Sequence, residues 1–188
     1  VSGKASFDDL REVDVEDLLG RDPIPPRPDL IRASIEGRSV MVTGAGGSIG
    51  SELCRQIIHL GATRLVLVDH SEPSLYAIER ELRATAELHG LPLEILAVLA
   101  SVTESDFLRQ VMQSFKIRTI YHAAAYKHVP LVEYNMGAGI RNNVIGTYRT
   151  AQAAERAGVE TFVLVSTDKA VNPTNVMGAS KRFAEMIL

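Results

Sequence analysis

Short apolar runs alternate with longer amphipathic stretches from Arg38 to the end of the chain. The runs at 40–42, 65–68 and 162–165 are apolar at every position, which is typical of strands covered on both faces. The pattern predicts strands at 39–43, 64–69, 93–99, 117–122 and 160–166, and helices at 48–60, 72–88, 103–115, 136–157 and 176–188. Parallel strands need crossover connections, and right-handed crossovers place helices on both faces of a sheet. We therefore expect an α/β fold with a doubly wound parallel sheet in strand order 3-2-1-4-5.

The first 37 residues follow a different pattern. Residues 7–19 are acidic with scattered aliphatic side chains, and residues 21–28 contain four prolines, which cannot continue a helix. We interpret 1–37 as an ordered arm or linker, with a disordered chain end as the alternative, and 38–188 as one nucleotide-binding domain.

Composition narrows the class of protein. A chain of 188 residues that is 46% hydrophobic and 23% charged suits one soluble globular domain. Its net charge of −3, without a basic cluster, gives no reason to expect nucleic acid. Cys54 is the only cysteine, so no internal disulfide can form, and a reducing, cytoplasmic location fits. We expect no metal site. The sequence has no signal peptide and no apolar run of about 18 residues, so we also expect no membrane contact by this chain.

Three glycines spaced three apart follow the first predicted strand and open a helix. Gly44 permits a tight turn, Gly47 lets the backbone approach a phosphate, and Gly50 lets the helix lie close to the strand. This is the Rossmann pattern for a dinucleotide, in which the helix start, here Ser48 and Ile49, faces the diphosphate. Asp69 ends the second strand about 20 residues further on, where its carboxylate can bind both ribose hydroxyls, so NAD is favoured over NADP.

Two further segments follow strands at the same edge of the predicted sheet. After the fourth strand, Ala123, Ala124 and Ala125 would let the backbone pass close to a dinucleotide, and His122 is expected to be a packed strand-end residue. Lys127 and His128 lie in the following loop, where they are candidates for binding phosphate or sugar. After the fifth strand, residues 166–169 bring hydroxyl, carboxylate and amine groups together; a tight turn capped by Asp and Lys is the structural alternative.

The segments TGAGGSIGSEL, VLVDHSE, HAAAYKHVP, NNVIGT and STDKAVNPTNVMGASKR resemble one branch of the extended short-chain dehydrogenase/reductase superfamily. This is the CapD-like polysaccharide-biosynthesis branch, whose members include UDP-N-acetylglucosamine 4,6-dehydratases. The resemblance covers practically the whole chain, and its most specific part runs from Ser166 to Lys181. The arm sequence VEDLLGR is similar to the segment that leads into this domain in long, membrane-anchored members.

The resemblance implies catalytic roles for residues near the fifth strand. The superfamily usually has a hydroxyl residue there and a Tyr-x-x-x-Lys pair; here Thr167 and Lys181 match, but Met177 stands in the tyrosine position. Positions 177 and 181 share a helix face, so the geometry is kept while the usual base is absent. In the long members of this branch methionine is common there, and the acid–base work shifts to the run that this chain retains as Thr167, Asp168 and Lys169.

The implied reaction is an internal redox cycle that converts a UDP-sugar to a 4-keto-6-deoxy sugar. NAD takes hydride from C4, water leaves across C5 and C6, and the hydride returns to C6. By resemblance Thr167 would bind the C4 oxygen, Asp168 would protonate the departing C6 hydroxyl and Lys169 would take the C5 proton. The base for the C4 hydroxyl stays open, with Asp168 as first choice, and a lysine base would need a lowered pKa.

The remaining binding residues are also implied by resemblance. Asn143 corresponds to the superfamily's helix asparagine, although the neighbouring Asn142 leaves the register open, and Ser101 would supply part of an adenine contact. Asn172 joins Lys127 and His128 as a substrate contact. The chain ends at Leu188, so we expect the C-terminal substrate domain to be largely missing. A nucleotide-sugar epimerase and a non-catalytic NAD-binding module are the alternatives to a 4,6-dehydratase, and the exposed helices leave a homo-oligomer open.

Overall fold

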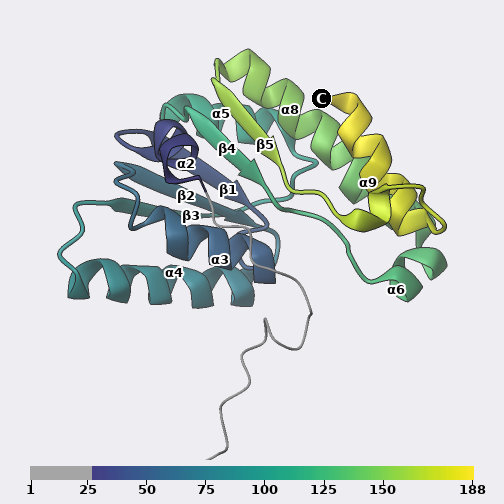
Figure 1. Cartoon of the computed structure of the whole chain (residues 1–188), viewed down its shortest axis with the longest axis horizontal. Coiled ribbons are helices and arrows are strands. Elements are labelled where there is room, and N and C mark those ends of the chain that lie inside the picture. The colour runs from purple at the N-terminus through teal and green to yellow at the C-terminus, as the bar shows by residue number, and fades with distance from the viewer. Residues whose placement is uncertain (1–26) are drawn as a thin grey trace, which may run out of the picture.

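The computed structural model describes residues 27–188, and for residues 28–30 the backbone alone. The expected acidic segment at 7–19 lies outside the described residues. Within them, five parallel strands form one sheet in the order β3-β2-β1-β4-β5, which confirms the predicted topology (Figure 1). Their bounds are β1 Ser39–Thr43, β2 Arg64–Asp69, β3 Glu94–Leu99, β4 Thr119–His122 and β5 Thr161–Leu164.

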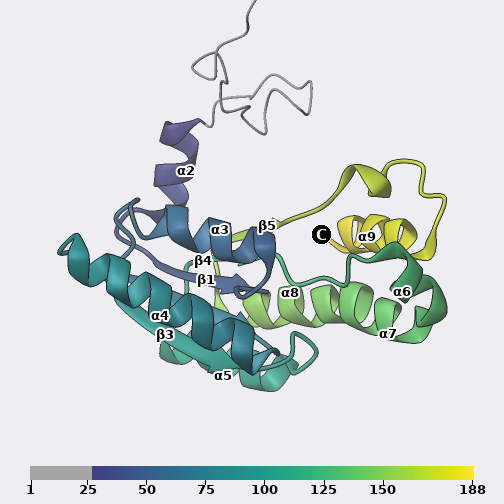
Figure 2. The same cartoon turned by 90° about the horizontal axis from the view of Figure 1, so that it is seen from below.

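Helices cover both faces of the sheet, and alternate residues of each strand pack toward opposite faces. Val40 and Val42 join the cluster on the side of α3 (Ser48–Ile57) and α4 (Glu72–Leu88). Met41 joins the cluster on the side of α5 (Ser105–Ser114) and α8 (Gly146–Ala157). Figures 1 and 2 show these two helical layers on either side of the sheet. Burial of β1 on both faces explains why its sequence is continuously apolar.

The region between β4 and β5 is more divided than the sequence predicts. The expected helix 136–157 consists of α7 (Met136–Ile140), a π-helical turn η2 (Arg141–Ile145) and α8. A further short helix, α6 (Val129–Tyr134), lies in a segment interpreted as loop, with a proline in its first turn where the missing N–H is tolerated. A 3₁₀ turn, η3 (Asp168–Ala170), precedes the last helix, α9 (Val176–Ile187).

The described part of the expected arm packs against the sheet. Residues Pro28–Ile35 form the helix α2, and the side chain of Ile35 is buried in the core. The hydroxyl of Thr119, the first residue of β4, donates to the carbonyl of Ser34, and the Ser34 hydroxyl lies 3.0 Å from that of Tyr121. The helix α2 therefore covers the amino-terminal end of β4, opposite the edge expected to bind ligand (Figure 2). In the part of the chain described, no helix is both long and apolar enough to cross a membrane.

Candidate functional site

The glycine-rich turn after β1 is packed so closely that three of its glycines, Gly44, Gly46 and Gly50, have no room for a side chain. Gly44 has a φ of +68°, and a Cβ there would lie 2.7 Å from the backbone of Ala124. A Cβ on Gly50 would lie 1.9 Å from the Gly44 carbonyl oxygen, so α3 lies directly against the turn. Gly47, by contrast, is exposed and lines the cavities beside the turn. Gly44 and Gly50 therefore make the tight turn and the close helix contact expected from the sequence, while the approach of a phosphate to Gly47 stays a prediction.

Two adjoining cavities open at the carboxyl edge of the sheet, one on each side of this turn. The larger, of about 700 Å³, reaches from the glycine turn and the start of α3 to the loop after β5 and to α9. The smaller, of about 220 Å³, reaches from the glycine turn to the end of β2. Both are lined by Gly44, Gly47, Ala123, Ala125 and Tyr126. A dinucleotide has two halves joined by a diphosphate, and this shape offers one cavity for each half.

Asp69 is held at the floor of the smaller cavity. The side chain is only 7% exposed, and its two oxygens accept hydrogen bonds from the backbone N–H of Gly46 at 2.9 Å and of Ser71 at 2.8 Å. A carboxylate has lone pairs beyond these two, so it can still accept from ribose hydroxyls. Ser101 lies outside both linings, although its neighbours Ala100 and Val102 line the smaller cavity. Its hydroxyl lies 2.8 Å from that of Thr103.

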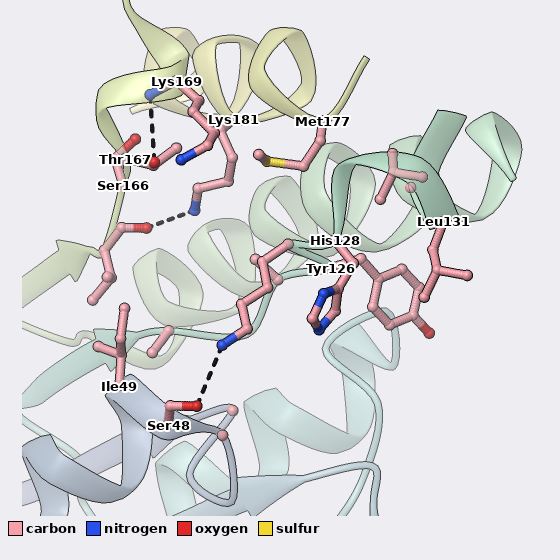
Figure 3. A pocket seen from close by; sticks show the side chains of 18 of the residues that line it. Ser48, Ile49, Tyr126, His128, Leu131, Ser166, Thr167, Lys169, Met177 and Lys181 are labelled. Atoms are coloured by element: carbon pink, nitrogen blue, oxygen red, sulfur yellow. Dashed lines mark hydrogen bonds between the residues drawn. The ribbon is translucent and has the colours of Figure 1, made fainter. Parts of the chain in front are cut away.

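The loop after β4 forms a wall shared by both cavities. Ala123 and Ala125 line both, and Ala124 lines the smaller one. Lys127 lines the larger cavity, and its ammonium donates to the hydroxyl of Ser48, which Figure 3 labels, at 3.3 Å. His128 also lines that cavity. The lysine therefore holds a positive charge beside the amino-terminal end of α3, an arrangement that favours an anion between them.

The turn after β5 is organised by its own polar side chains. Asp168 accepts at one oxygen from the Thr167 hydroxyl at 2.9 Å and from the Lys169 backbone N–H at 3.0 Å. The Thr167 hydroxyl, and to a lesser extent the Lys169 ammonium at 3.6 Å, lower the pKa of Asp168, whose side chain is 78% exposed. Thr167 and Lys169 line the larger cavity. These contacts cap the turn and keep Asp168 ionised.

The helix α9 brings Met177 and Lys181 to the same cavity. Figure 3 shows both side chains pointing from α9 into the space that faces Ser48 and Ile49. The Lys181 ammonium donates to the carbonyl of Val165 at 2.5 Å, and burial lowers its pKa, with Glu185 opposing this effect. A Cβ on Gly178 would lie 2.3 Å from the Lys169 carbonyl oxygen, so α9 packs directly on the turn. Asn172 lies outside both cavity linings and is exposed, with a φ of +48°.

Asn143 supports the site from beneath its surface. The side chain is buried in η2 and bonds both backbone groups of Tyr126, accepting from its N–H at 2.8 Å and donating to its carbonyl at 3.0 Å. The amide also donates to the Ser180 hydroxyl in α9 at 2.9 Å. Asn142, and not Asn143, lines the smaller cavity. The π-helical turn therefore connects the β4 loop to α9 through one side chain.

His122 is a packed residue at the end of β4, as expected. Its Nδ1 lies 2.7 Å from the Thr43 hydroxyl and its Nε2 lies 3.1 Å from that of Thr147. Thr147 gives its only hydroxyl proton to the carbonyl of Asn143, so it must accept from an Nε2–H of His122. Burial, and then the charge of Lys181, lower the pKa of His122 to about 3, so the ring is neutral.

The far wall of the larger cavity was not predicted from the sequence. This wall comes from α6 and α7 and consists of Leu131, Val132, Asn135, Ala138 and Gly139. Glu133 ties α6 to α9 by accepting from the Val176 N–H at 2.6 Å. A proline followed by an apolar pair in VPLVEY was the available signal for a short helix here. Across residues 27–188 no group of three His, Cys, Asp or Glu side chains is arranged to hold a metal ion.

Comparison with known proteins gives a family and several relatives. The family described as polysaccharide biosynthesis protein matches residues 40–188. The capsular polysaccharide biosynthesis protein CapD of Staphylococcus aureus is 47% identical over 188 residues, which are 100% of this chain and 31% of that protein. The probable polysaccharide biosynthesis protein EpsC of Bacillus subtilis is 46% identical over 99% of this chain and 31% of its own length. An inverting UDP-N-acetylglucosamine 4,6-dehydratase of Campylobacter jejuni is 28% identical over 77% of this chain and 40% of its own length.

Solved structures share the fold. Pen from Bacillus thuringiensis aligns with a TM-score of 0.74 and 25% identity, over 82% of this chain and 46% of its own. A UDP-glucose 4-epimerase of Stenotrophomonas maltophila aligns with a TM-score of 0.71 and 22% identity, over 80% of this chain and 47% of its own. That structure contains NAD and a formylated UDP-arabinopyranose. DesIV, a dTDP-glucose 4,6-dehydratase of Streptomyces venezuelae with bound NAD, aligns with a TM-score of 0.66 and 24% identity, over 79% and 50%. This chain therefore spans about half of these structures and about a third of CapD and EpsC.

Proposed function

Because the chain belongs to the polysaccharide biosynthesis protein family of the extended short-chain dehydrogenase/reductase superfamily, we propose that it carries the NAD site and the acid–base residues of a nucleotide-sugar 4,6-dehydratase. One observation supports this most directly. The glycine turn, the Thr167–Lys169 turn and Lys181 line or border a single cavity at the carboxyl edge of the sheet. A cofactor bound at the glycine turn would therefore have its reactive end beside the Thr167–Lys169 turn and Lys181.

The residues around the two cavities fit NAD. The exposed Gly47 and the start of α3, Ser48 and Ile49, would face its diphosphate, while Gly44 and Gly50 keep turn and helix together. Asp69 would bind the adenosine ribose, and its charge disfavours the additional phosphate of NADP. Lys181 would hold the nicotinamide ribose. When bound, NAD would supply an acceptor for hydride from the sugar C4 and a donor to C6.

Asn143 and Ser101 act indirectly in this proposal. Asn143 would position the wall of the groove through the backbone of Tyr126, because its own amide is already bonded to protein atoms. Ser101 would orient the loop whose neighbouring residues line the adenosine cavity. Lys127 and His128 would bind phosphate and sugar groups in the larger cavity, with Asn172 completing the substrate contacts from the following loop.

The proton transfers would be made by the turn after β5. Asp168, which its lowered pKa keeps ionised, would accept the proton of the C4 hydroxyl, and the carboxylic acid formed would then protonate the C6 hydroxyl as it leaves. Thr167 would hold the C4 oxygen by exchanging its hydrogen bond to Asp168 for one to substrate. Lys169, after its ammonium has lost a proton to solvent, would remove the C5 proton as a neutral amine and return it to C5 when hydride reaches C6. Met177 cannot accept a proton; it would pack against the sugar or the nicotinamide ring.

Product analysis tests this proposal. Because the chain spans 31% of CapD and EpsC, the assay uses a longer protein that contains these residues and the region that follows them in the relatives. Incubation with UDP-N-acetylglucosamine should give a 4-keto product that has lost one water, and Lys169→Ala should abolish this product while NADH binding persists. Absence of product from a protein that has bound NAD would refute the dehydratase proposal.

An epimerase is the second candidate, because UDP-glucose 4-epimerases of Rickettsia are 27% identical over 80% of this chain. A product that keeps its C6 hydroxyl would favour that reaction. A non-catalytic NAD-binding module would bind NADH but give no product with any UDP-sugar, and Lys169→Ala would change nothing.

A further inference from the structure

The aromatic rings of His70 and Tyr126 meet beside the smaller cavity, which both residues line together with Gly44 and Gly47. Tyr126 lines both cavities, and His70 lines the smaller one. Their ring centroids lie 6.1 Å apart with the planes at 71°, an edge-to-face arrangement. The mechanism proposed above uses neither side chain.

The chain topology makes this contact a bridge. His70 directly follows β2, Tyr126 follows the three alanines after β4, and β1 lies between these two strands in the sheet. The glycine turn after β1 therefore lies between the two loops that the rings connect. A ligand lying along the glycine turn from one cavity to the other must pass the point where the rings touch.

The two ends of the bridge are anchored differently. The backbone of Tyr126 is held at both its N–H and its carbonyl by the buried Asn143, so its ring can move chiefly by rotation about side-chain bonds. The His70 ring extends from the residue after the buried Asp69, with Nδ1 at 3.5 Å from the Asp69 carboxylate. The backbone under the Tyr126 ring is held by the two hydrogen bonds to Asn143, and the contact between the rings is the part that can open.

Burial argues against a role in the core. The side chain of His70 is 61% exposed, and Tyr126 is 40% exposed. Removing either ring leaves no buried cavity, so the stability of the fold does not depend on the pair in the way it depends on a core residue. An exposed aromatic pair beside a cavity is better placed to contact a ligand than to support the core.

We propose that the His70–Tyr126 ring pair forms a strap across the dinucleotide groove, which covers the adenosine half of NAD and slows its release. This rests on the NAD site proposed above. A reaction that returns hydride to its own product regenerates NAD at every turnover, so slow release of the cofactor is compatible with continued activity.

Release kinetics of NADH from the chain test the strap. NADH fluorescence is followed in a stopped-flow instrument while an excess of NAD displaces the bound NADH. We expect Tyr126→Ala and His70→Ala each to speed release about 3- to 10-fold, the range of one aromatic pair. The double variant should be no faster than the quicker single variant, within about twofold, because both remove the same contact. Tyr126→Phe keeps the ring and should release NADH at the unaltered rate.

Tyr134→Ala is the matched control, because this tyrosine lies on α6, is 89% exposed and lines neither cavity. Its release rate should equal that of the unaltered chain. Unchanged release from Tyr126→Ala, or a double variant whose effect is the product of the two single effects, would overturn the strap alone. Failure of the unaltered chain to bind NADH would overturn the NAD site and the strap together.

Discussion

Acidification should destabilise this fold through His122. Its ring is fully buried, and both nitrogens are used in the neutral form, with Nδ1 facing the Thr43 hydroxyl and Nε2 donating to Thr147. A second ring proton would place a positive charge in the core, and none of the groups that contact the ring is a carboxylate that could balance it. Burial is the main reason why the pKa falls from 6.5 to about 3.

The sign and size follow from linkage between protonation and folding. Between these two pH values the unfolded chain binds a proton at His122 and the folded chain does not, so the free energy of unfolding falls as the pH is lowered. Each pH unit in that window corresponds to about 1.4 kcal/mol. His122 alone should therefore lower the free energy of unfolding by about 2 kcal/mol between pH 7 and pH 5.

Urea unfolding at pH 7, 6 and 5 measures this loss in the unaltered chain and in His122→Gln. At pH 7 the His122→Gln variant should be less stable by about 1 to 2 kcal/mol, because the hydrogen bond to Thr43 is lost. Between pH 7 and pH 5, the fall in its free energy of unfolding should be smaller than that of the unaltered chain by about 2 kcal/mol. His89→Gln is the control: it removes an exposed histidine that directly follows α4, and its free energy of unfolding should fall between pH 7 and pH 5 by as much as that of the unaltered chain. Equal losses in the unaltered chain and in His122→Gln would refute the argument.

Three shorter predictions concern the site. Gly50→Ala should lower the free energy of unfolding by roughly 2 kcal/mol or more and abolish NADH binding, because the new Cβ would lie 1.9 Å from a backbone oxygen. In the control Gly137→Ala the new Cβ has no atom within 4 Å, so stability and NADH binding should stay unchanged. Urea unfolding measures the stability of both variants, and calorimetric titration measures their NADH binding. Asp69→Asn should weaken NADH binding about tenfold and reduce the ratio of NADH affinity to NADPH affinity. Titrations of the variant with NADH and with NADPH measure this ratio, and an unchanged ratio would contradict the role of the carboxylate. Glu185→Gln should lower the pKa of Lys181 further, because the Glu185 carboxylate opposes the effect of burial. NMR titration of the Lys181 ammonium measures this pKa, and an unchanged value would contradict the prediction.

The alternation of apolar runs predicted the sheet correctly, because a strand covered on both faces must be apolar at every position. The runs at β1 and β2 gave the strand bounds without error, since both strands have a neighbour on each side and are buried at every position except Arg64. At the edge, β5 ends at Leu164 where the sequence predicts 166, because an edge strand pairs on one side only and its polar end turns toward the site. The short helix α6 was missed because six residues are too few for a clear periodic pattern.

The sequence by itself determined which residue types the site contains and the sheet edge where they lie, because parallel strands all end at the same edge. The glycine spacing, Asp69 and the run from Thr167 to Lys169 were all recognisable as local patterns. Only the tertiary structure decided which of these side chains face the cavity. Asn143 is turned inward by a π-helical turn to bond the backbone of Tyr126, and Tyr126 meets His70 across the glycine turn. Such contacts join residues 17 and 56 positions apart in the chain (143 − 126 and 126 − 70), so they depend on how strands and helices pack and leave no periodic signal in the sequence.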